Sequence, residues 1–254
     1  MPDPAHARRP APEEELPKKE VSATAAGRLG LARDAITATK AVLNFGAGNQ
    51  VEALRNTRLN SMARLQIMRD ADHIYWELAP EVRRIAAANP EALIAAKADL
   101  AHGGNCGEHA WVTYHYLRQH GAGQHIQLSA KEGLDHAFVL IGDVQGRDAD
   151  SDIAVSDPCP TRARACLWED HFAYTPDRAK IEDNASMVAD GESKKSAIAA
   201  GLRLSAAGQA YVNAQASQAE TDEVIGKASE YHLWNHPNAE ASGSKFNYVN
   251  EDGH

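Results

Sequence analysis

Three glycines surround a cysteine near the middle of the chain, in the segment Gly103-Gly104-Asn105-Cys106-Gly107. Glycine lets a backbone turn sharply and lets another molecule approach it closely. The residues from Cys106 to His120 carry an apolar stripe with helical spacing, and Gly121 follows as a helix stop. The pattern predicts a helix that begins at Cys106, where the helix dipole and the free backbone N–H groups favour a thiolate.

Two strand-like apolar runs follow this helix. His136 opens the run Ala137–Ile141, and Asp157 closes the run Ile153–Val155. The connection between the runs is rich in glycine and aspartate, so we expect an antiparallel hairpin with a long loop. In that pairing, Asp157 lies next to His136 and accepts its Nδ1–H. A nucleophile, a base and a residue that orients the base are then present together: Cys106, His136 and Asp157.

Neighbouring residues have secondary roles with open alternatives. Asn105 is predicted either to cap the helix or to donate its side-chain amide to an oxyanion. Gly107 belongs to the first helical turn, whose free N–H groups are further oxyanion donors. A competing interpretation is a zinc site, with ligands drawn from Cys106, His109, His136 and Cys159. These ligands are scattered, so we predict no metal and no other cofactor.

Composition excludes several classes of protein. The net charge of −9 argues against a general nucleic-acid binder. No apolar run approaches the ~18 residues of a membrane span, and the first residues contain no apolar core of a secretory signal. The three cysteines form neither a CxxC pair nor an even disulfide framework, which fits a reducing compartment at the place of action.

The chain changes in character along its length, and we divide it into four parts. We expect an α+β protein with a disordered leader over 1–22, a helical region over 23–100, a catalytic core over 101–234 and a flexible tail over 235–254.

Finer expectations concern individual elements. One long helix is predicted from Val51 to Trp76, and Pro80 and Pro90 suit the first turns of two further helices. Residues 176–192 are polar and predict a loop, whereas the alanine-rich stretch 193–219 predicts a helix.

The order of cysteine, histidine and aspartate resembles that of the papain and transglutaminase-like superfamily. The strings GGNCGEHA, DHAFVLIG and AVSDP are similar to the signatures G-N-C-(G/D)-E, D-H-x-(F/W)-(V/L) and V-x-D-P-W of secreted bacterial effectors and toxins with a papain-like fold. The resemblance covers roughly residues 100 to 175. It implies a papain-like core in which Cys106 is the nucleophile, His136 the base and Asp157 the orienting residue.

Two departures from the family pattern stand out. Cys159 occupies the position after Asp-Pro where such sequences often have tryptophan. The stretch Ala98–Ala101, before the cysteine, lacks the glutamine that donates to the oxyanion in papain.

The resemblance implies a thiol-dependent amidohydrolase that acts on a protein, as a glutamine deamidase or a cysteine protease, with transglutamination as a related outcome. It further implies a bacterial effector secreted by a non-Sec route, with a host protein as substrate in the host cytoplasm; otherwise the protein is cytoplasmic. The alternative is a non-catalytic interaction module on the same scaffold, which binds through its acidic surface and helical half. The sequence leaves the oligomeric state open.

Overall fold

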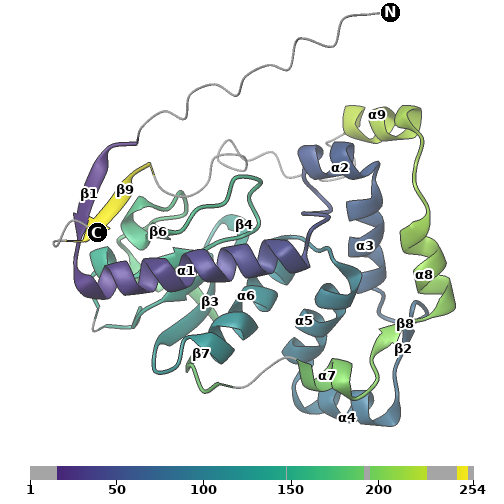
Figure 1. Cartoon of the computed structure of the whole chain (residues 1–254), viewed down its shortest axis with the longest axis horizontal. Coiled ribbons are helices and arrows are strands. Elements are labelled where there is room, and N and C mark those ends of the chain that lie inside the picture. Colours follow the sequence, from purple (N-terminus) through teal and green to yellow (C-terminus); the bar gives the residue numbers. More distant parts are fainter. Residues whose placement is uncertain (1–15, 147, 192–194, 228–244, 251–254) are drawn as a thin grey trace, which may run out of the picture.

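A five-stranded sheet forms the centre of the computed structural model, which describes residues 16–146, 148–191, 195–227 and 245–250 (Figure 1). The strand order is β6-β5-β4-β3-β7, and every neighbouring pair is antiparallel. The strands are β3 (His125–Lys131), β4 (Leu134–Ile141), β5 (Ala154–Ser156), β6 (Cys166–Leu167) and β7 (Ile181–Val188). The predicted α+β class and the predicted β4–β5 hairpin are thus confirmed.

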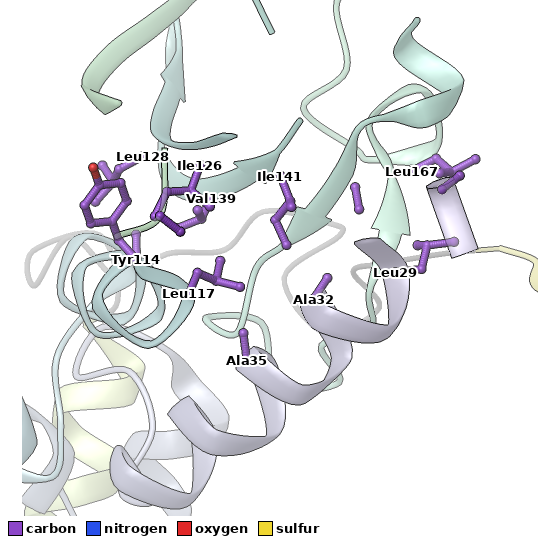
Figure 2. Close-up of a cluster of buried hydrophobic side chains, with 14 of the residues drawn as sticks. Leu29, Ala32, Ala35, Tyr114, Leu117, Ile126, Leu128, Val139, Ile141 and Leu167 are labelled. Carbon is purple, nitrogen blue, oxygen red and sulfur yellow. The ribbon is translucent and has the colours of Figure 1, made fainter. Parts of the chain in front are cut away.

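Helices α1 (Ala23–Val42) and α6 (Cys106–His120) cover one face of this sheet. Figure 2 shows Ala32 and Ala35 of α1 turned toward the strands, with Leu117 of α6 beside them. Alanine side chains add little bulk, so the long helix packs close to the sheet. The burial of this face fixes where the first residue of α6, Cys106, meets the strands.

The opposite face of the sheet is also buried. Along β4 the side chains alternate, so that Val139 and Ile141 face α1 and α6, whereas Phe138 and Leu140 pack into a second core with Trp168. A strand that is buried on both faces has little freedom to move. His136 shares the face of Phe138 and Leu140 and is held by this packing.

The remaining helices form a second layer, at the right of Figure 1. The C-terminal helices pack against the earlier ones, α7 on α4, α8 on α3 and α9 on α2. Pro80 and Pro90 begin α4 and α5, as predicted. The bounds are α2 (Val51–Thr57), α3 (Asn60–Met68), α4 (Pro80–Ala88), α5 (Pro90–Ala101), α7 (Lys195–Ala199), α8 (Ala206–Asn213) and α9 (Gln218–Gly226).

The prediction of one long helix from Val51 to Trp76 is wrong. The chain breaks between α2 and α3, where Arg58 and Leu59 both adopt the left-handed conformation, with φ of 48° and 62°. Trp76 lies in a short strand, β2 (Trp76–Glu77), that pairs with β8 (Arg203–Leu204). A non-glycine residue in the left-handed conformation gives no sequence signal. The apolar residues keep a helical spacing across Arg58 and Leu59, so the spacing alone predicts one continuous helix.

Two further predictions need correction. The supposed loop 176–192 contains β7, an edge strand whose residues Glu182 and Asp183 are exposed. Its polar side chains suit an edge that faces solvent, which is why the run did not look like a strand. The supposed helix 193–219 consists of α7, the strand β8, and α8, followed by the start of α9; residues 192–194 lie outside the described residues.

Segments near the two ends of the chain pair with each other. Strand β1 (Lys18–Val21) runs parallel to β9 (Asn247–Asn250), at the left of Figure 1. The chain is therefore ordered at positions inside the predicted leader 1–22 and the predicted tail 235–254, although residues 1–15, 228–244 and 251–254 lie outside the described residues. Within the described ranges, no helix combines the length and the apolar character that a membrane crossing requires.

Candidate active site

Cys106 is the first residue of α6 and is partly exposed. Asn105 is the N-cap, and its backbone N–H donates to the Glu108 carboxylate over 2.7 Å. That carboxylate folds back over Gly104, where an added Cβ atom would lie 2.3 Å from the Glu108 Cβ atom. The Glu108 side chain can take this position only because residue 104 has no Cβ atom. Gly104 and Glu108 together fix the backbone that carries the Cys106 thiol.

A second interaction holds the Glu108 carboxylate in place. The Arg69 guanidinium donates from Nε to Oε1 over 3.1 Å and from a terminal nitrogen to Oε2 over 3.2 Å. A two-point contact of this kind fixes the carboxylate in orientation as well as in position. The Arg69 side chain is 53% exposed, whereas Glu108 is buried. A charged group thus lies at the surface close to the cysteine.

His136 and Asp157 form a buried pair. The register of β4 with β5 pairs Val139 with Ser156, so Asp157 follows on the same side as His136, as its diagonal neighbour. The His136 ring contacts Asp157 Oδ2 through Nε2 over 2.7 Å. The expected contact through Nδ1 is therefore wrong. The Cys106 sulfur lies close enough to His136 to raise the pKa of its ring, so the three groups belong to one site.

The charges of this pair support each other. Burial by itself lowers the pKa of His136, but the Asp157 carboxylate and the adjacent Cys106 sulfur outweigh it and raise the pKa to about 10. Burial by itself raises the pKa of Asp157, but His136 and then His171 outweigh it, and the pKa lies well below its usual 3.8. The pair is thus an imidazolium and a carboxylate at neutral pH.

Two further groups hold Asp157, and the sequence reasoning identified neither contact. Oδ1 accepts the backbone N–H of Cys159 over 3.2 Å, and Oδ2 lies 3.2 Å from Nε2 of His171. His171 is buried, in the segment that follows the 3-10 turn Trp168–Asp170. The sequence signal that could have indicated a buried His171 is its place next to the aromatic residue Phe172.

The two predicted oxyanion residues lie in the first turn of α6. Asn105 and Glu108 form a capping box at the helix start, so the structure favours the capping role of the Asn105 side chain. A Cβ atom added at Gly107 would meet no atom within 4 Å apart from its chain neighbours and the backbone of its own helix. The first N–H groups of a helix have no acceptor within the helix, so those at the start of α6 can donate to the oxygen of an incoming carbonyl group.

Substitution of Gly104 by alanine is expected to lower the free energy of unfolding by about 1–3 kcal/mol, because its Cβ atom would overlap Glu108. Gly107→Ala is the matched control, since its Cβ atom meets only open space in a helix. We expect it to be neutral or to stabilise by roughly 0.5 kcal/mol. Urea unfolding followed by circular dichroism measures both variants. Equal midpoints for the two would contradict the account of this turn.

The residues of the zinc interpretation do not gather around a common point. Among the residues that the structure describes, no three or more His, Cys, Asp or Glu side chains are arranged to hold a metal ion. Burial lowers the pKa of His109 to about 4, and its neutral ring contacts Asn105 O through Nδ1 over 2.8 Å. Burial also raises the pKa of the Cys159 thiol well above its usual value, which disfavours the thiolate form that binds a metal.

The site thus links a partly exposed cysteine at a helix start, a buried histidine and a buried aspartate, with His171 behind them. Comparison of the chain with protein-family models, with curated proteins and with solved structures gives no match.

Proposed function

We propose that this protein is a thiol-dependent amidohydrolase that acts on protein substrates, built on a papain-like core. The observation that carries the proposal is the buried His136–Asp157 pair beside the Cys106 sulfur, which stands at a helix start. Cys159 and Cys166 are buried thiols, whereas Cys106 is partly exposed. The set contains each group that amide hydrolysis through a thioester requires.

The proposed reaction has two halves. The Cys106 sulfur attacks the carbonyl carbon of an amide, and the N–H groups at the start of α6 stabilise the negative oxygen. The C–N bond then breaks, and His136 gives its proton to the departing ammonia or amine. In the second half, His136 takes a proton from water and the water oxygen attacks the thioester carbon. The C–S bond breaks, and the carboxylic acid leaves while the thiolate and the imidazolium are restored.

The surroundings of the sulfur suit a large substrate. Open space adjoins Gly107, and the exposed Arg69 guanidinium and the exposed Asp135 side chain lie toward the cysteine side of the site. A nucleophile in this position can reach a glutamine side chain or a peptide bond on the surface of a protein substrate. The resemblance to secreted effectors extends the proposal to a bacterial protein that modifies a host protein in the host cytoplasm.

The rate of alkylation of Cys106 by iodoacetamide tests the proposal without a known substrate. An ordinary thiol has a pKa of about 8.5 and is almost fully protonated at pH 6, so it reacts slowly there. We expect Cys106 of the native protein to react at pH 6 at least about tenfold faster than Cys106 of the His136→Ala variant. Peptide mass spectrometry locates the adduct.

The same digest contains its own controls. Cys159 and Cys166 are buried and are expected to stay unmodified until denaturant is added. If Cys106 reacts no faster than in His136→Ala, or reacts only after unfolding, the thiol is structural. A non-catalytic interaction module then becomes the better explanation of this scaffold.

A further inference from the structure

His171 contributes a second histidine to the aspartate of the site. Its Nε2 atom lies 3.2 Å from Asp157 Oδ2, the same oxygen that His136 Nε2 contacts over 2.7 Å. Both rings are buried, with His171 only 3% exposed. One carboxylate oxygen therefore serves two imidazoles that belong to different segments of the chain.

The backbone fixes the tautomer of His171. The N–H group of Ala173 donates to His171 Nδ1 over 3.3 Å, so Nδ1 carries a lone pair and no proton. The proton of the neutral ring must then be on Nε2, where it is donated to Asp157. Burial lowers the pKa of His171 and keeps the ring neutral beside the positively charged His136.

The segment that carries His171 is anchored on both sides. Its ring packs at 5.0 Å from the ring of Phe138 and at 4.4 Å from that of Phe172, which in turn lies 5.2 Å from the His136 ring. The preceding Asp170 accepts hydrogen bonds from Lys19 of β1 and Tyr248 of β9. These contacts leave the imidazole little freedom to turn away from Asp157.

We propose that His171 is a positioning residue, whose Nε2–H holds the Asp157 carboxylate in the orientation that His136 needs and shares its negative charge. This role rests on the proposed function, because it acts on the base of that reaction. A donor on Oδ2 takes up part of the charge that would otherwise stabilise the imidazolium of His136. His171 thus makes His136 a better proton donor to the leaving group than an unshared carboxylate would allow.

The other charged or titratable groups around Asp157 and His136 come from four further segments. They are Lys40 on α1, Cys106 and His109 on α6, Cys159, and Cys166 on β6. His109, Cys159 and Cys166 are buried and stay neutral near pH 7. A change at His171 is therefore expected to be felt chiefly by His136.

Long-range ¹H–¹⁵N NMR of the histidine rings tests the proposal on the full chain. In the native protein we expect His171 to show the neutral Nε2–H tautomer between pH 5 and 9. In His171→Phe, which keeps an aromatic ring but has no donor, the titration of His136 is expected to move up by about one pH unit. His171→Gln places an amide donor near the same point and is expected to restore most of the native value.

An Nδ1–H tautomer of His171 in the native protein would overturn the proposal. This measurement uses the native protein alone, so it does not depend on whether a variant folds. An unchanged His136 titration in a folded His171→Phe variant would overturn it as well. Failure of the proposed function has a different signature, since Cys106 would then react with iodoacetamide like an ordinary thiol while both NMR results stand as expected.

Discussion

The proposed amide hydrolysis is expected to fall by at least about 10⁴-fold when Cys106 is replaced by alanine, the range seen when a triad nucleophile is removed. No other described cysteine can substitute, because Cys159 and Cys166 are buried and burial raises the pKa of both thiols. Ammonia release from a capped glutaminyl peptide and the cleavage of fluorescently labelled casein distinguish deamidation from proteolysis. Whichever signal the native protein gives should disappear in Cys106→Ala.

The fold should tolerate this substitution, because the Cys106 side chain is only partly buried. We expect the free energy of unfolding to change by less than about 1 kcal/mol. Cys166→Ala is expected to give the opposite phenotype, since Cys166 is fully buried in β6. It should lose about 1–2 kcal/mol of stability and keep its activity. Full activity in Cys106→Ala would rule out a mechanism that uses the Cys106 thiol.

The sequence predicted the elements that carry the cysteine, the histidine and the aspartate. Glycines around Cys106 and Gly121 marked both ends of α6, and apolar runs marked β4 and β5, so the three side chains could be expected to meet. Such local signals are strong because each comes from the backbone conformation that a residue type permits. The orientation of the His136 ring has no such signal and was predicted the wrong way round.

Contacts between segments that are distant in the chain could not be predicted from the sequence. His171 follows no helical or strand spacing that relates it to Asp157, and the two meet only because β6 returns beside β5. The strand β7 was missed because its exposed side is polar, and the pairing of β1 with β9 joins segments from opposite ends of the chain. Long-range pairing depends on which surfaces remain to be covered once the local elements have formed, and local patterns do not contain that information.

Asp157→Ala is expected to destabilise the protein by about 3–5 kcal/mol at pH 6, because the buried His136 imidazole would lose its partner. Two other donors, the Cys159 N–H and the His171 ring, would also be left without an acceptor. Urea unfolding monitored by tryptophan fluorescence measures the loss. Asp135→Ala is the matched control, since Asp135 adjoins His136 but is exposed, and it should change stability by less than about 0.5 kcal/mol.

The pH dependence of this difference tests the origin of the effect. The pKa of His136 is raised from 6.5 to about 10, so its contribution is complete below pH 6.5 and declines as the pH rises toward 10. The pKa of Asp157 is lowered, so its contribution is present above its usual 3.8 and declines at more acidic pH. The difference in free energy of unfolding between the native protein and Asp157→Ala should therefore be largest between about pH 4 and 6.5. A gap that stays constant up to pH 10 would mean that packing, and not the ion pair, accounts for the stability that Asp157 confers.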